Sequence, residues 1–192
     1  MSCETKFLPA DEYLRYVEQA VSAELDQYIQ SRYLGFVIVT SVTVYEIAAK
    51  EIISTFANKK HKIFGSFIDG RFEKIDARIQ IEDLDNDFVK YFGERYSKKF
   101  KQLLADKEEE TLQTKRASMK AAYKNLIRWR HDFVHNGNAP TTTNLAEVCS
   151  FYELGKDVIR CFDEALNSSR SKATNAIVAP VAVAATAAAH QP

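Results

Sequence analysis

The sequence is poor in the residues that divide a chain into short strands. Only six of its 192 residues are Gly and four are Pro, which disfavours a β-sandwich with many turns and favours long helices. The three cysteines, Cys3, Cys149 and Cys161, are odd in number and lack paired spacing. No disulfide framework is therefore indicated, and a reducing, cytoplasmic location is expected.

Long apolar runs and an excess of charge of one sign are also missing. Every apolar run of the main body is broken before it reaches the length of a membrane span, and the first residues do not resemble a secretion signal. We therefore expect no membrane association. Lys plus Arg is 26 and Asp plus Glu is 26. This balance argues against coating of nucleic acid by bulk charge, but a local basic site is still allowed.

The common catalytic signatures are absent from the sequence as well. It contains no GxGxxG, GxxxxGK[ST], HExxH, GxSxG or CxxC pattern, so dinucleotide, P-loop, zinc-protease, α/β-hydrolase and dithiol chemistry have no motif to support them. A functional site, if present, must therefore use a pattern of residues outside these common motifs.

The chain divides into a helical domain, residues 1–170, and a tail, residues 171–192. The tail is rich in Ala and Val and is interrupted by Pro180. We interpret it as disordered or loosely docked, with a membrane or partner contact as the alternative. The domain is predicted to be all-α.

The first helix is predicted from about residue 9, where Pro9 and Asp11 suit a first turn, to a stop or bend at Gly35. Residues 36–57 are ambiguous, because their Val- and Thr-rich front half favours a strand by propensity. No turn signal interrupts them, so we predict a central buried helix with two neighbouring apolar stripes. The first helix should bury one stripe, formed by Leu14, Val17, Val21, Leu25, Tyr28 and Ile29.

Short helices are expected over residues 58–96, with a turn or cap near Asp83–Asp87. Residues 96–137 contain no Gly or Pro before Gly137 and predict one long helix that ends at Asn136-Gly137. Asn144, with Glu147 three residues later, predicts the cap of a last helix over 145–166.

The histidines point to a candidate site at the end of the long predicted helix. Of the four, His61 lies in a basic surface stretch and His190 in the tail, whereas His131 and His135 lie in RWRHDFVHNG. His131 and His135 are four apart and share one helical face. Arg130 and His135 are five apart, about 140° around a regular helix. They meet only if the helix loosens or if a second chain completes the site.

This pattern resembles the Arg-polar-x3-His signature of HEPN domains (higher eukaryotes and prokaryotes nucleotide-binding), as Arg130-His131-x3-His135. Its position near the end of a penultimate helix, after the apolar GFVIVTSVTVYEIAAKEII helix, is similar too. The FIDGRFEKI…FVKYFG stretch resembles the insert of HEPN domains in RNA-processing and phage-defence systems. The resemblance covers most of residues 10–167 and implies a HEPN-like helical bundle with short helices before the motif helix.

The resemblance also implies an activity, that of a metal-independent endoribonuclease without cofactor, acting in a toxin or defence system as a homodimer. His135 would be the general acid or base, Arg130 would stabilise charge on the phosphate, and His131 would orient its partner or bind phosphate. An antitoxin or regulatory protein is the further partner expected. Some HEPN toxins carry a Tyr after the motif, but here Asn136-Gly137 follows, so modification at that place is not expected.

Helical spacing adds Arg128 and Lys124 as guides for the phosphate chain, with Asn136 as a further substrate contact. Asp132 either pairs with Arg128, which we favour, or holds a catalytic His. Trp129 is interpreted as a core or interface residue rather than a stacking platform for bases.

Three alternatives to the nuclease stay open from the sequence. The cluster is a set of solvated cations that stabilise a helix end, or the fold binds RNA or a protein without cleaving. The third alternative is a zinc site in which His131 and His135 are joined by Cys149 or Cys161, although those cysteines have the neighbours of plain core residues.

Overall fold

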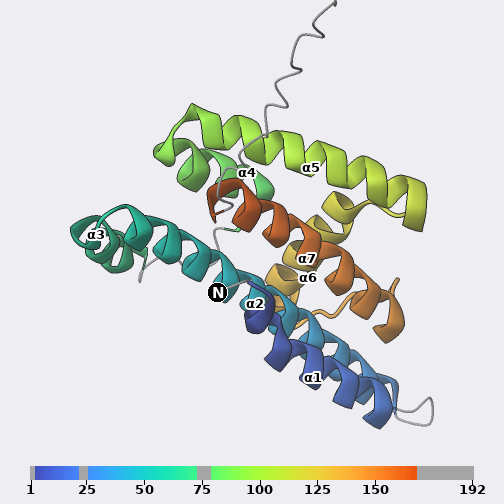
Figure 1. Ribbon diagram of the computed structural model, residues 1–192. Helices are drawn as coiled ribbons and strands as arrows, with labels where there is room; N and C mark the ends of the chain where they lie inside the picture. Colours follow the sequence, from blue (N-terminus) through green and yellow to red (C-terminus); the bar gives the residue numbers. More distant parts are fainter. Residues whose placement is uncertain (1–2, 22–25, 73–78, 168–192) are drawn as a thin grey trace, which may run out of the picture.

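The computed structural model describes residues 3–21, 26–72 and 79–167, and within those ranges the chain forms helices and no strand (Figure 1). The all-α prediction is confirmed. The α-helices are α1 (Glu4–Ala20), α2 (Gln27–Lys60), α3 (Lys62–Phe72), α4 (Ile81–Asp83), α5 (Glu94–Lys115), α6 (Met119–Asn136) and α7 (Leu145–Asn167). A π-helical turn, η1 (Leu84–Val89), and a 3₁₀ turn, η2 (Lys90–Phe92), connect α4 to α5.

Helix α2 is the central element, and both of its predicted stripes are buried. Helices α1, α3, α6 and α7 all contact it, so a helix that is apolar on two sides is needed here. Gly35 was wrongly predicted as a stop, because it lies inside α2 and is buried there. The buried stripes are Val37, Ser41, Val44, Ala48 and Ile52, and Ile38, Val42, Tyr45, Ala49 and Ile53.

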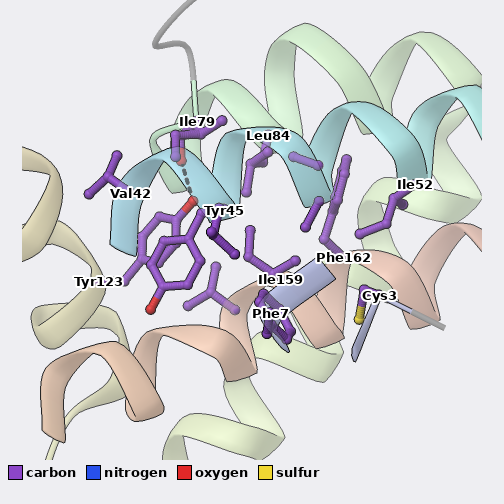
Figure 2. Close-up of a cluster of buried hydrophobic side chains, with 14 of the residues drawn as sticks. Cys3, Phe7, Val42, Tyr45, Ile52, Ile79, Leu84, Tyr123, Ile159 and Phe162 are labelled. Carbon is purple, nitrogen blue, oxygen red and sulfur yellow. Dashed lines mark hydrogen bonds between the residues drawn. The ribbon is translucent and has the colours of Figure 1, made fainter. Parts of the chain in front are cut away.

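Helix α7 lies between α2 and α5 and also packs on α6 (Figure 1). Three fully buried tyrosines join these helices. The ring of Tyr45 stacks on Tyr152 and on Tyr123, at centroid distances of 5.7 and 5.2 Å. The Tyr45 hydroxyl donates to the carbonyl of Tyr152. The Tyr123 hydroxyl donates to the carbonyl of Ile79 at 2.6 Å, as Figure 2 shows. These buried hydroxyls thus find hydrogen-bond acceptors within the core, in backbone carbonyls.

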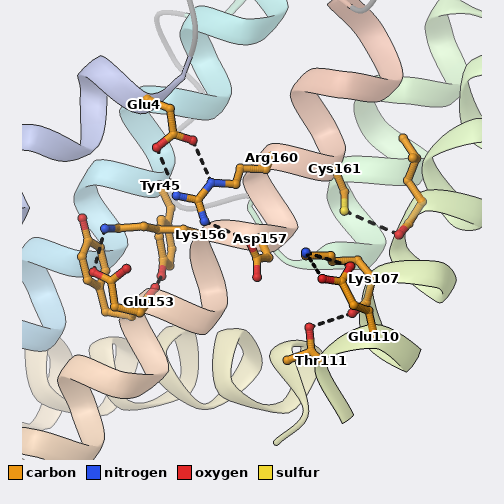
Figure 3. Close-up of polar contacts among 12 residues, drawn as sticks. Glu4, Tyr45, Lys107, Glu110, Thr111, Glu153, Lys156, Asp157, Arg160 and Cys161 are labelled. Carbon is orange, nitrogen blue, oxygen red and sulfur yellow. Dashed lines mark hydrogen bonds and ion pairs between the residues drawn. The ribbon is translucent and has the colours of Figure 1, made fainter. Parts of the chain in front are cut away.

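Helix α1 is fastened to α7 by ion pairs. Arg160 contacts Glu4 at 2.7 Å, and the buried ammonium group of Lys156 contacts Asp11 at 2.7 Å. Figure 3 shows Arg160 and Lys156 on successive turns of α7. The hydrogen bond from Arg160 lowers the pKa of Glu4, which indicates that this pair favours the ionised carboxylate.

The predicted first helix is divided in the structure. Helix α1 ends at Ala20, and the next residue, Val21, is extended, so one continuous helical register does not run into α2. Leu14 and Val17 are buried as predicted, but Tyr28 and Ile29 are exposed on α2. Leu25 and the tail lie outside the described residues.

The single long helix predicted over residues 96–137 is also wrong, because the chain turns between α5 and α6. Arg116 adopts the left-handed conformation, with φ of 52°. Ser118 then caps α6 by accepting the N–H of Ala121 at 3.0 Å, and Glu108 accepts from the Ser118 hydroxyl and from the N–H of Lys120. These bonds satisfy the open N–H groups of a new helix start and favour two helices over one.

The short helices expected over residues 58–96 are present as α3, α4, η1 and η2. Asp85 does not form the expected turn, since it is buried in η1 and accepts from Ser97 at 2.6 Å. The predicted cap of the last helix is confirmed, because Asn144 Oδ1 accepts the N–H of Glu147 at 2.9 Å. None of the described helices has the apolar length that a membrane span needs.

Candidate nucleotide-binding site on helix α6

The C-terminal half of α6 carries the motif and is a regular helix through Asn136. Gly137 ends it with φ of 70°, and its N–H donates to the Phe133 carbonyl at 2.9 Å. Residues 130–135 therefore keep the normal twist, and Arg130 and His135 stay about 140° apart. A loosened helix end, one of the two ways to bring them together, is excluded.

The start of α2 fixes the end of α6. A Cβ at Gly35 would lie 2.1 Å from the Phe133 ring, so only Gly admits this ring. Phe36 meets Phe133 edge-on at 5.7 Å, and Arg32 donates to the carbonyl of Gly137 at 3.3 Å. The motif helix is thus held at its last turn by aromatic packing and by a cation on the final carbonyls.

Among the three motif residues, Arg130 is the one whose side chain is partly buried, whereas those of His131 and His135 are exposed. Its Nη2 lies 3.7 Å from Oε1 of Glu46 on α2, and the two side chains are 22% and 15% exposed. Nε of Arg130 is buried and has no hydrogen-bond partner among the described residues. The guanidinium group is therefore positioned by a carboxylate, and a ligand would meet it through its Nη atoms, because Nε is covered.

Glu46 is the functional candidate that sequence reasoning missed. A signal was present but not specific, since Glu46 is one of two carboxylates, with Glu51, within the helix predicted to be buried. A carboxylate in such surroundings needs a partner. The sequence could not say that Arg130, 84 positions later, would be that partner.

A pocket of about 490 Å³ opens beside Arg130. Three parts of the chain form it: one face of α6, the middle of α2, and the segment that leads into α4. Its polar lining consists of Lys124, Arg128, Arg130 and His131 from α6, Glu46 from α2, and Gln80 and Glu82 from the α4 segment. Three cationic groups and one imidazole stand against two carboxylates, and this excess of one positive charge suits an anionic ligand.

The two motif histidines form a contiguous surface next to the pocket. Their ring centroids are 4.4 Å apart with a 48° tilt, and both side chains are exposed. His131 lines the pocket, whereas His135 and Asn136 do not. One chain therefore combines Arg130 with His131 but presents His135 outward, at the exposed end of α6.

The remaining predicted residues take different places. Lys124 forms an ion pair with Glu82 at 2.5 Å, on the rim of the pocket. Arg128 is exposed and donates to Asn125 at 3.1 Å. The favoured pair between Arg128 and Asp132 does not occur among the described residues, because the Arg128 guanidinium points towards the preceding turn of α6, where Asn125 lies.

Trp129 has the packing role that was predicted for it. Its ring stacks on Phe151 of α7 at 5.6 Å with a 6° tilt, and it is partly buried. It joins α6 to α7 and leaves the opposite face of α6 to the pocket.

The zinc alternative finds no donor set in the described part of the chain, where no three His, Cys, Asp or Glu side chains gather suitably for a metal ion. Burial raises the pKa of both Cys149 and Cys161 to about 12. Their thiols therefore stay protonated at neutral pH, as core cysteines do.

Comparison with known protein families gives a match over most of the chain. The HEPN family model described as RiboL-PSP-HEPN matches residues 10–168. The chain therefore belongs to the HEPN family, and within it resembles the RiboL-PSP group in particular. Comparison with curated proteins and with solved structures gave no match.

Proposed function

We propose that this HEPN domain is a metal-independent endoribonuclease that acts as a toxin or phage-defence effector. The observation that carries the proposal is the joint presence of Arg130 in a pocket lined by further cations and of His131 and His135, whose rings are in contact, beside it. Guanidinium and imidazole groups together supply what cleavage of a phosphodiester needs: charge stabilisation and proton transfer.

In the proposed reaction the 2′-hydroxyl oxygen of RNA attacks the adjacent phosphorus. Its proton passes to a base, the bond from phosphorus to the 5′ oxygen breaks, and that oxygen takes a proton as it leaves. The products are a 2′,3′-cyclic phosphate and a 5′-hydroxyl. His135 transfers one of these protons, Arg130 stabilises the charge on the phosphate oxygens, and His131 holds the phosphate. Lys124 and Arg128 guide the flanking phosphates, and Asn136 contacts the substrate at the helix end.

A direct test is incubation of the purified protein with single-stranded RNA in EDTA. We expect cleavage to persist, products to carry a cyclic phosphate, and a 2′-O-methyl RNA of the same sequence to resist, because its attacking hydroxyl is blocked. Binding of RNA without any cleavage would favour a non-catalytic HEPN module. Cleavage that needs added Mg²⁺ would contradict the mechanism.

The separation of Arg130 from His135 leads to a proposed homodimer in which each chain completes the other's site. A largely exposed stripe on α2, apolar except for two threonines, offers a surface for the second copy, since Phe36 and Ile47 are 53% and 49% exposed. It consists of Ile29, Tyr33, Phe36, Thr40, Thr43 and Ile47, which fall within about 40° of one direction at 100° per residue. Exposed Val134 adds an apolar group on α6, beside His135.

The substitution Ile47→Glu tests this interface. It places a charge on the stripe and is expected to raise the dimer dissociation constant by about tenfold or more. Cleavage should fall with it and recover at high protein concentration. Sedimentation velocity measures the dimer, and Tyr16→Glu, an exposed aromatic on α1, is the control. A strict monomer with full activity would remove the shared site from the mechanism.

A further inference from the structure

A second cationic surface lies at the far end of α2, away from the pocket beside α6. Lys60 closes α2 and Lys62 opens α3, and both are exposed. Exposed Arg95 and Lys98 lie in the first turns of α5, and exposed Lys90 lies in η2. In Figure 1 the end of α2 and the start of α5 are on the same side of the molecule, next to α3.

Aromatic contacts bring these segments together. The Phe56 ring of α2 packs on Phe92 of η2 at 4.7 Å and on Tyr96 of α5 at 5.1 Å. The Lys60 ammonium lies 5.2 Å from the Phe56 ring centroid. The Arg95 guanidinium lies 4.4 Å from the ring of Tyr96 and donates to its hydroxyl. Cations from two elements distant in the sequence thus converge around one tyrosine.

Two cations, Lys60 and Arg95, act on the hydroxyl of this tyrosine. Partial burial raises the pKa of Tyr96, but the hydrogen bond from Arg95 and the charges of Lys60 and Arg95 outweigh it and lower the pKa. In the described part of the chain, none of the five cations named above forms an ion pair with a carboxylate. Glu94, at the start of α5, is a carboxylate near them.

We propose that Lys60, Lys62, Lys90, Arg95 and Lys98, with Tyr91 and Tyr96, form a binding surface for the backbone of single-stranded RNA, here called the Tyr96 surface. The choice of RNA rests on the proposed nuclease function. The charges match phosphates, and the Tyr91 ring, 81% exposed, offers a platform on which a base can stack. A neutral protein needs such a local site to capture RNA.

The spacing between the two sites suits one bound strand. Glu46 and Lys60 are fourteen residues apart on α2, about 21 Å along its axis and within about 40° of one face. At roughly 3.4 Å per phosphate of a stacked strand, this distance corresponds to about six nucleotides as a minimum, because the strand must pass over the side chains that bury Ile53 and Ala57 on this face of α2. Glu82, which lines the pocket, and Asp85, in η1, are paired with Lys124 and Lys101, which limits their repulsion of phosphates. The Tyr96 surface would therefore hold the substrate several nucleotides from the scissile bond.

The test is titration of a fluorescent 12-nucleotide 2′-O-methyl RNA, which resists the proposed cleavage, with wild type and with Lys60→Gln/Arg95→Gln. Removing two phosphate contacts should weaken binding several-fold and make the slope of the log of the binding constant against log salt concentration less negative by about 1.4. The control Arg15→Gln/Lys115→Gln removes the same charge from exposed positions elsewhere and should change neither.

The outcomes separate this proposal from the nuclease. Weaker binding with a less negative salt slope supports the Tyr96 surface even if no RNA is ever cleaved. Unchanged affinity and slope overturn it even if the wild type cleaves well. Binding to vesicles of phosphatidylcholine and phosphatidylserine that is lost in the same variant, with RNA affinity unchanged, would also overturn it and assign the surface to lipid.

Discussion

Replacing His135 by Ala is expected to lower the rate of RNA cleavage by about 10²–10⁴-fold, because a proton-transfer group is lost. Arg130→Ala should cost about 10²–10³-fold, since the charge that develops on the phosphate oxygens loses its guanidinium partner. His135 is exposed at the end of α6, so its removal should leave the thermal midpoint unchanged. Initial rates on a fluorogenic RNA, with Arg15→Ala as the control, measure both effects.

Mixing the two inactive variants makes this prediction sharper. In a dimer of one Arg130→Ala chain and one His135→Ala chain, neither subunit has a complete motif, but one intact Arg130 still faces one intact His135 of the other subunit. Cleavage should therefore reappear on mixing and reannealing. Failure to recover, in a sample shown to contain mixed dimers, would assign each active site to a single chain. Full activity of either variant alone would end the proposed catalytic role of that residue.

The substitution Gly35→Ala should destabilise the protein by about 2 kcal/mol, although Ala is the better helix former by about 1 kcal/mol. The added methyl group would overlap the Phe133 ring, which fits against Gly35 without a Cβ. The ring must move and take the last turn of α6 with it. Thermal unfolding should show a loss of about 4–8 °C in the midpoint.

Two further variants decide whether the clash is the cause. Gly70→Ala, in α3, adds a methyl group with no atom within 4 Å, so it should be neutral or stabilising. In the background of Phe133→Leu, where the ring is absent, Gly35→Ala should cost about 1 kcal/mol less than in the wild type. A destabilisation that persists unchanged without the ring would show that Phe133 does not set the requirement for Gly35.

The sequence predicted which faces of the helices are buried more accurately than it predicted where the helices begin and end. The stripes of α2 were predictable, because a helix surrounded by others must be apolar on several sides and the spacing shows it. The division between α5 and α6 was not, since Arg116 and Ser118 carry no Gly or Pro signal. It depends on Glu108, which reaches the new helix start from within α5.

In the candidate site, too, local spacing was predictable from the sequence and contacts between distant segments were not. Arg130, His131 and His135 could be found from the spacing within RHDFVH, because positions along one helix follow from its regular twist. Glu46, the pocket and the Tyr96 surface could not, because each joins side chains separated by tens of residues in the sequence.

By itself, then, the sequence determined an all-α protein, the buried faces of its central helix, and the order of Arg and His along α6, all of which are local properties of helical periodicity. Tertiary structure alone decided that Glu46 holds Arg130, that Gly35 admits Phe133, and that Lys60 and Arg95 meet at Tyr96. These contacts depend on how helices pack in space, and helical spacing carries no information about which distant helix will be the neighbour.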